Sequence, residues 1–195
     1  MDYTDLPQEV RIARSKKQML WFAIASLVMM FAGLTSAYVV SRGRKDWVEI
    51  ELPEEFIIST GLIVLSSLTL WLAKKSIIAG KQSMGTLLTV LTFILGAVFV
   101  YLQFAGFEAL VNNGVFLTGA GSSVNASFIY LIVLAHLAHI AAGLIALLVM
   151  TIKTIRGKYT ADNILGFELG SIFWHFVDIL WVYLLLFLLF AKDIF

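Results

Sequence analysis

Five long, uninterrupted apolar segments constrain this chain more than any other feature of its sequence. Each is long enough to cross the roughly 30 Å hydrocarbon core of a bilayer as a helix that rises about 1.5 Å per residue. Backbone amides cannot stay unpaired in lipid, and the segments do not alternate in polarity, so helices are expected and a β-barrel is not. The predicted spans are 20–40, 56–73, 87–107, 128–152 and 172–191. We therefore predict an all-α, polytopic membrane protein, with residues 1–195 forming one membrane domain, a bundle of five transmembrane helices.

The composition agrees with this fold and excludes several functions. Hydrophobic residues make up 60% of the 195 positions and charged residues 14%, whereas soluble domains carry about 25% charge. A net charge of +1 gives no indication of a nucleic-acid partner. The absence of cysteine excludes disulfides, Fe–S clusters, covalently attached haem and a thiolate-bridged copper site. The first apolar segment is too long for a signal-peptide core, so we expect it to be retained.

The distribution of lysine and arginine predicts the orientation in the membrane. The basic residues expected on one side are Arg11, Arg14, Lys16, Lys17, Lys74, Lys75, Lys81, Lys153, Arg156 and Lys158, and those on the other are Arg42, Arg44, Lys45 and Lys192. Cytoplasmic connections carry the excess of such residues, so the N-terminus is predicted to be cytoplasmic and the C-terminus outside.

All three histidines lie within predicted spans, where ionisable groups cost several kcal/mol unless they are paired. His136 and His139 are three residues apart and share a face of the fourth helix. Counting along the helices puts His139 about 20 Å and His175 about 5 Å from the cytoplasmic boundary. Ligands of one metal lie within about 2 Å of it, so this difference in depth predicts no shared metal or haem site. We expect His136 and His139 to be neutral and to hydrogen-bond to neighbouring helices.

The fifth helix carries a polar stripe and an aromatic one. The polar residues at helical spacing are Glu168, Ser171, His175 and Asp178, and beside them Trp174 and Trp181 are seven apart. One interpretation is a satisfied hydrogen-bond network that joins Glu168, His175 and Asp178 and locks this helix to its neighbours. The other is a proton-accessible or lipid-headgroup site near the cytoplasmic face, where basic residues favour anionic lipids. Both stay open. Small residues four apart, such as Gly33 with Ala37, predict close helix contacts.

The motif FWHFVDILW at 173–181 resembles the signature near the C-terminus of subunit III of the haem-copper oxidases. Glu168 has the family's spacing to His175, and His136 and His139, followed by Gly143, resemble its His-x-x-His helix. Five helices match the shorter bacterial members. Many members carry a glutamate after a serine in the first of these helices, but here Ser26 is followed by leucine, so that residue's role does not transfer.

The resemblance implies a non-catalytic, lipid-binding subunit III of a bacterial terminal oxidase in aerobic respiratory electron transport. Such a subunit binds no haem or copper itself; those groups belong to the partner subunits, the catalytic subunit I and the copper-bearing subunit II. It holds phospholipid and supports the stability and proton uptake of the catalytic subunit in the bacterial cytoplasmic (inner) membrane. The residues expected to line a lipid or polar cleft, or to pack against a subunit, are Glu168, Trp174, His175, Asp178 and Trp181. Those expected to hydrogen-bond between helices are His136, His139 and Gln103.

Three alternatives stay open. A small transporter gathers its ionisable groups at one midplane site, often at broken helices, whereas these groups lie at several predicted depths and no predicted span contains a proline. A b-type cytochrome needs facing histidines at one depth. A subunit of a quinol-oxidising enzyme is the third alternative, because the resemblance favours cytochrome c as the donor but the donor site resides in other subunits.

Overall fold

The chain folds into five long helices, as predicted. The computed structural model describes residues 7–119, 122–160 and 163–194, which contain no strand. The helices are α1 (Gln8–Ser41), α2 (Glu54–Ile78), α3 (Gln82–Asn112), α4 (Val124–Ile155) and α5 (Leu165–Ile194). Each is long and apolar enough to cross a membrane. The predicted all-α class and the predicted number of membrane-spanning helices are therefore confirmed.

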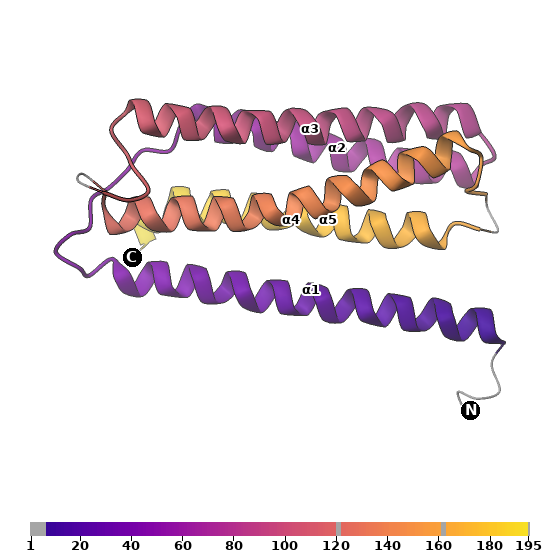
Figure 1. The fold of residues 1–195 in the computed structure, drawn as a ribbon, viewed down its shortest axis with the longest axis horizontal. Helices are drawn as coiled ribbons and strands as arrows, with labels where there is room; N and C mark the ends of the chain where they lie inside the picture. The colour runs from indigo at the N-terminus through magenta and orange to yellow at the C-terminus, as the bar shows by residue number, and fades with distance from the viewer. Residues whose placement is uncertain (1–6, 120–121, 161–162, 195) are drawn as a thin grey trace.

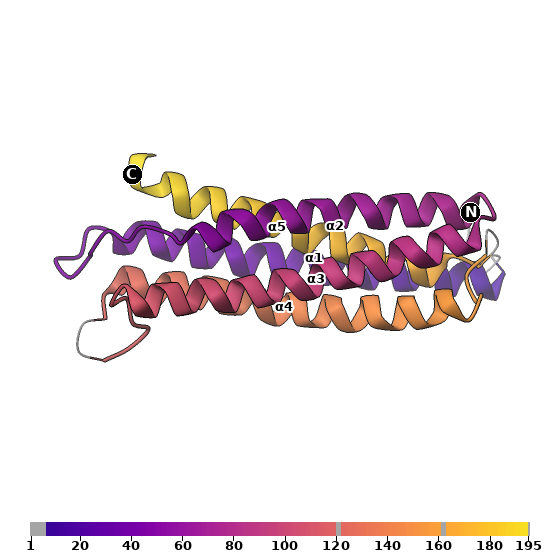
Figure 2. The ribbon, with the colours of Figure 1, turned by 90° about the horizontal axis from the view of Figure 1, so that it is seen from above.

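The helices run up and down, so that the two ends of the chain lie at opposite ends of the bundle (Figure 1). The α1–α2 and α3–α4 connections lie at the end that carries the C-terminus, which we call the C-terminal end. The α2–α3 and α4–α5 connections lie at the other, N-terminal end, as the view in Figure 2 also shows. Helices α2 to α5 form the main bundle, and α1 packs along its side against α4 and α5.

Local sequence accounts for where the helices begin and end. Pro53 immediately precedes α2, and the Ser123 side chain caps α4 by accepting a hydrogen bond from the backbone N–H of Ala126 at 3.1 Å. A glycine with positive φ follows the last residue of α3 and of α4 by two positions, with φ 76° at Gly114 and 65° at Gly157, a conformation that glycine adopts without strain.

The helices extend beyond the predicted spans, because polar residues continue the helix outside the apolar segment. The largest consequence concerns α5, which begins at Leu165 rather than at 172. Glu168 therefore lies inside α5, and His175 lies more than two turns from the helix start.

The small residues chosen from spacing alone do not make the close contacts. Gly33 faces outward, with nothing within 4 Å of a Cβ placed there, and Ala37 is exposed. Close packing occurs instead at Gly96 on α3 and Gly143 on α4, where a Cβ would lie 2.7 Å and 3.0 Å from the Trp174 ring. Spacing predicts a ridge of small residues, but the rotation of the helix decides whether that ridge meets another helix.

Candidate functional site

A hydrogen-bonded group joins α5 to α2 inside the bundle. The Nδ1 atom of His175 lies 2.9 Å from the Ser67 hydroxyl oxygen, and that hydroxyl donates to Oδ2 of Asp178. The direction of the bond between His175 and Ser67 depends on which ring nitrogen of His175 carries the proton. Asp178 is only 2% exposed, and its Oδ2 also lies 3.3 Å from the Ser66 hydroxyl, which shares its proton with the Ile63 carbonyl at 2.7 Å. We call His175, Ser67, Asp178 and Ser66 the α2–α5 polar cluster.

The two tryptophans of α5 are fully buried and complete the contact with α2. Trp174 donates from Nε1 to the Ser66 hydroxyl at 3.0 Å, and Trp181 donates to the Thr60 hydroxyl at 2.8 Å. A buried indole N–H normally finds such a partner. Both rings therefore serve packing within this chain, and their polar edges fix the register of α5 against α2.

Glu168 belongs to a separate ionic group near the N-terminal end. Its two carboxylate oxygens pair with Lys17 of α1 at 3.2 Å and Lys74 of α2 at 3.1 Å. We call these three residues the lysine–glutamate cluster. The described residues show no hydrogen bond from Glu168 to His175 or Asp178. Of the two interpretations of the polar stripe, the one that joins all three residues in a single network therefore does not describe this arrangement. The fourth stripe residue, Ser171, has a buried hydroxyl with no described partner.

The histidines of α4 make different contacts from those expected. His136 is fully buried, stacks on Trp181 with ring centroids 5.1 Å apart, and meets the rings of Phe31 and Phe99 edge-on. Neither of its ring nitrogens has a hydrogen-bond partner among the described residues, so the expected bond to a neighbouring helix is absent there. His139 hydrogen-bonds through Nδ1 to the Ala135 carbonyl of its own helix, at 2.7 Å.

Gln103 does make an interhelical hydrogen bond. Its Nε2 donates to the Ser59 hydroxyl of α2 at 2.8 Å. Both residues are fully buried, which raises the cost of leaving either unpaired. Spacing could not identify Ser59, because serine is common in membrane helices and its partner lies on another segment.

The predicted difference in depth between the histidines is too large. Trp181, which stacks on His136, lies six residues or about 9 Å beyond His175 along α5. His139 lies about 4.5 Å from His136 in the opposite direction, back toward the N-terminal end, because α4 runs antiparallel to α5. About 5 Å therefore separates His139 from His175 along the bundle. The earlier start of α5 is the main reason for the difference.

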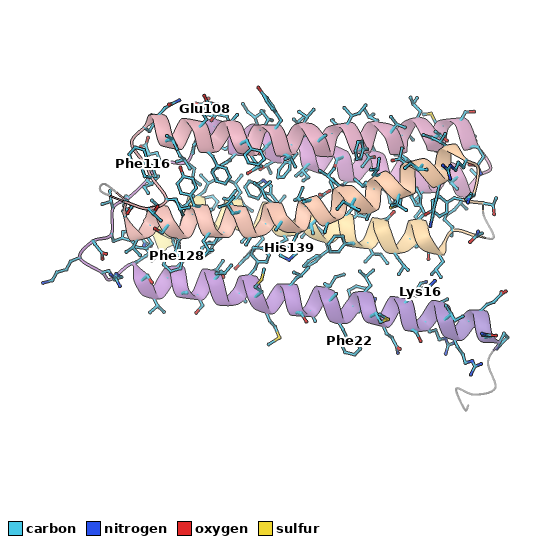
Figure 3. All side chains as sticks on the ribbon, viewed as in Figure 1. Lys16, Phe22, Glu108, Phe116, Phe128 and His139 are labelled. Atoms are coloured by element: carbon cyan, nitrogen blue, oxygen red, sulfur yellow. The ribbon has the colours of Figure 1, made fainter. Side chains whose placement is uncertain are left out.

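His139 and His175 are separated mainly because they lie on different faces of the bundle. His139 lies on the side of α4 that faces α1, against Phe31 at 5.8 Å between ring centroids (Figure 3), whereas His175 faces Ser67 of α2. Within the part of the chain that the structure describes, no three His, Cys, Asp or Glu side chains are grouped closely enough to hold a metal ion. The described polar groups are arranged to bond helices together and to pair charges.

Comparison with known proteins decides the family. A family model described as cytochrome c oxidase subunit III matches residues 16–192, nearly the whole chain. The chain belongs to this family. The resemblance in helix α5 is thereby confirmed, and the chain is a multi-pass subunit of the haem-copper oxidase complexes. Membership leaves the transporter alternative without support.

Relatives of this subunit III serve two kinds of oxidase. The chain is 30% identical over 168 residues to a probable cytochrome c oxidase subunit 3 of Nocardia farcinica, covering 82% of this chain and 79% of that protein. It is 29% identical over 167 residues to the cytochrome c oxidase subunit 3 of Corynebacterium diphtheriae, covering 80% and 78%. It is also 29% identical over 167 residues to the cytochrome bo(3) ubiquinol oxidase subunit 3 of Pseudomonas aeruginosa, covering 83% and 78%.

Two functional candidates were not identified from the sequence. Lys17 and Lys74 looked like ordinary basic residues at helix ends, yet they hold Glu168 from two different helices. The sequence showed only that Glu168 lies on the side of the membrane where three basic segments are predicted. It did not show which lysines of those segments reach its carboxylate.

Proposed function

We propose that this chain is a non-catalytic, lipid-binding subunit III of a bacterial terminal oxidase of the cytochrome c oxidase type. In this proposal it lies in the cytoplasmic membrane beside the catalytic subunit I and the copper-bearing subunit II, which hold the haem and copper. It stabilises subunit I during turnover and supports its proton uptake. Family membership carries the assignment to an oxidase, and the contacts of α1 and α5 support the lipid role.

A groove between α1 and α5 supports the binding of an acyl chain. It has a volume of about 250 Å³, and the lysine–glutamate cluster lies toward its N-terminal end. The residues lining the groove are Val28, Phe31, Ala32, Phe176, Ile179, Leu180 and Tyr183. Phe176 is eight residues, or about 12 Å, from Glu168, so one phospholipid can place its headgroup beside the lysines and a tail in the groove. The two lysines against one carboxylate leave one positive charge for a phosphate.

Filling this groove tests the lipid role. Ala32→Phe puts a ring into the groove, whereas Ala25→Phe, at an exposed position of α1 outside the groove lining, is the matched control. The oxidase complex is purified in mild detergent, and its bound phospholipids are counted by mass spectrometry. We expect the first variant to lose lipid and to inactivate faster during turnover. Equal lipid content and lifetime in the two variants would contradict the proposal.

The α2–α5 polar cluster supports a role in proton uptake. It lies within a few turns of the predicted cytoplasmic end, and half-buried His175 connects it to the surface of the bundle. Asp178→Asn keeps the shape of the side chain and removes its ionisable group. We expect the haem spectrum and assembly to be unchanged while steady-state proton uptake slows. If the rate of proton uptake is unchanged over the pH range of activity, the cluster serves only the packing of α5 against α2.

The relative from Pseudomonas aeruginosa favours a second candidate, a subunit of a quinol-oxidising enzyme. The two candidates differ in the electron donor of the whole complex. The purified complex should oxidise reduced cytochrome c and not ubiquinol. Oxidation of ubiquinol with no response to cytochrome c would establish the second candidate.

A further inference from the structure

A groove lies between the start of α3 and the end of α4, which pack side by side at the N-terminal end of the bundle (Figure 1). Its volume is about 540 Å³. It shares no lining residue with the α1–α5 groove, and the two grooves are formed by different helices. A ligand in this α3–α4 groove therefore binds independently of the acyl chain proposed between α1 and α5.

The lining of the α3–α4 groove changes from polar to apolar along α3. Gln82 and Ser83 lie in the first turn, and Thr86 follows one turn later, just before the predicted apolar segment, which begins with Leu87. Leu87 and Val90 continue the wall inside that segment, and Leu87 is 63% exposed. The groove thus crosses the predicted boundary between the headgroups and the hydrocarbon layer. A ligand that fits it has a polar end and an apolar end.

The polar end of the groove is held in place by contacts within the chain. The Gln82 side chain donates from Nε2 to the Tyr159 carbonyl at 2.8 Å. Tyr159 is buried, and its ring meets Phe167 of α5 edge-on with ring centroids 5.5 Å apart. The segment after α4 is thereby tied to the start of α3 and to α5. A preorganised wall lowers the entropy cost of binding.

Basic side chains flank this polar end. Lys81 immediately precedes Gln82, and Arg156 and Lys158 stand on either side of Gly157, which lines the groove. All three basic residues are exposed, and none forms an ion pair with a described residue. None of the described lining residues is acidic, and the first turn of α3 contains no acidic residue. The charges around the groove therefore favour an anion over a cation.

We propose that the α3–α4 groove binds an anionic phospholipid, of the chemistry of phosphatidylglycerol. Its phosphate lies beside Lys81 and Arg156, and an acyl chain packs on Leu87 and Val90. A free phosphate ion uses the charges but gains nothing from the apolar wall. A zwitterionic lipid uses the wall but gains less from the excess of positive charge. The inference rests on the proposed lipid role only for the class of ligand, and it assigns a second site with its own headgroup preference.

The first test measures lipid binding to the purified oxidase complex. The complex is depleted of exchangeable lipid in detergent and titrated with dioleoylphosphatidylglycerol or dioleoylphosphatidylcholine, and bound lipids are counted by native mass spectrometry. Lys81→Gln with Arg156→Gln removes two charges beside the groove, whereas Arg11→Gln with Arg14→Gln removes two exposed charges of α1. We expect the first pair to weaken binding of phosphatidylglycerol about tenfold and to leave phosphatidylcholine unchanged, and the second pair to have little effect on either.

A second pair of variants tests the apolar part of the groove. Thr86→Phe puts a ring into the groove, and Met84→Phe adds a ring at a position of α3 that is 50% exposed and outside the lining. We expect the first to abolish the preference for phosphatidylglycerol and the second to keep it. The optical spectrum of the haems and the subunit content are measured for every variant, so that loss of assembly is recognised directly.

Three results would overturn the proposal. One is equal weakening by the two charge pairs, which means that only the general charge of this end attracts the lipid. Another is equal affinity of the unmodified complex for the two lipids. The third is unchanged binding of phosphatidylglycerol in Thr86→Phe, which places the lipid elsewhere.

The α1–α5 groove is tested separately. Ala32→Phe fills that groove, and we expect it to keep the preference for phosphatidylglycerol. If Ala32→Phe changes nothing while Thr86→Phe removes phosphatidylglycerol, the lipid role of the α1–α5 groove fails and the α3–α4 site stands. The reverse result overturns the α3–α4 site alone.

A further experiment locates the lipid in the unmodified complex. The probe is a phosphatidylglycerol that carries a diazirine in one acyl chain. On illumination the diazirine loses dinitrogen, and the resulting carbene inserts into a nearby C–H bond, which attaches the lipid to the protein. Peptide mass spectrometry should find the adduct in residues 82–90 or 152–155. Adducts in this chain confined to α1, α2 and α5 would contradict the site.

Discussion

Most of the described polar side chains that lie deep in this bundle find their partners on a different helix. Ser67 joins His175 to Asp178, and Ser66 accepts from Trp174, so two adjacent serines of α2 serve three residues of α5. In lipid no water competes for these groups, so such bonds fix the rotation of one helix against another. His136 differs, because aromatic rings surround it and neither nitrogen has a described partner.

Removing one hydroxyl from the α2–α5 polar cluster should loosen α5. Ser67→Ala removes the group that bonds both His175 and Asp178, and a buried polar group left unpaired costs about 1–3 kcal/mol. We expect a lower temperature for loss of this subunit from the complex, measured by thermal dissociation followed by gel electrophoresis. Ser76→Ala is the control, because the Ser76 hydroxyl is exposed and bonds only to its own helix. Equal midpoints for the two variants would show that the cluster contributes little to stability.

At the scale of elements, α5 organises the bundle because it packs against α1, α2 and α4. Its Trp174 ring also reaches α3 at Gly96, as well as Gly143 of α4 and Ser66 of α2. The absence of side chains at Gly96 and Gly143 therefore makes room for the Trp174 ring. The hydrogen bond from its indole N–H to Ser66 fixes the position of the ring along the helix axes. The family motif of α5 thus has a direct packing role in this chain.

A methyl group at Gly96 should disturb this packing. The added Cβ of Gly96→Ala would lie 2.7 Å from a carbon of the Trp174 ring, and overpacking of this kind costs about 1–3 kcal/mol. Gly33→Ala is the control, since a Cβ there meets nothing within 4 Å. We expect the first variant to lower the thermal stability of the complex and the second to leave it unchanged. Similar stability of both would mean that the ring moves aside without cost.

At the scale of the whole molecule, α1 is the least enclosed helix. Its N-terminal part is largely exposed, and Lys17 ties it to Glu168, which Lys74 of α2 also holds. The lysine–glutamate cluster thus links three helices at the N-terminal end. Because these residues are partly exposed, salt screens the interaction.

Loss of this ion pair should free the start of α1. We expect Lys17→Gln to increase hydrogen–deuterium exchange in residues 8–18 of the detergent-solubilised complex, by an amount equivalent to less than about 1 kcal/mol. Lys16→Gln removes the same charge from the neighbouring position, which forms no ion pair with a described residue. Indistinguishable exchange in the two variants would show that the pair does not hold α1.

The predicted orientation can be tested because the chain contains no cysteine. Gly43→Cys and Ser83→Cys place single thiols in exposed positions at opposite ends of the bundle. A membrane-impermeant maleimide added to intact cells should label the first and not the second. The opposite pattern would reverse the orientation.

Particular residues show how far the sequence could predict the site. The motif around His175 and the stripe from Glu168 to Asp178 were visible in spacing, yet spacing joined Glu168 to a network from which it is separate. The sequence predicted that Gln103 bonds to another helix, but it could not identify Ser59 as the partner, because Ser59 lies on a different helix. Side-chain partners depend on helix rotation and tilt, which no single segment encodes.

The sequence by itself determined the number and class of the elements, because the thickness of the hydrocarbon layer and the need to pair backbone amides leave long apolar segments only one conformation. It also indicated the family, through the motif at 173–181, and the family model that matches residues 16–192 confirms it. Only the tertiary structure decided which faces meet: Gly33 points outward, Gly96 and Gly143 receive Trp174, and two lysines from different helices share Glu168. These choices depend on the packing of all five helices together, where small shifts along and around each axis change every neighbour.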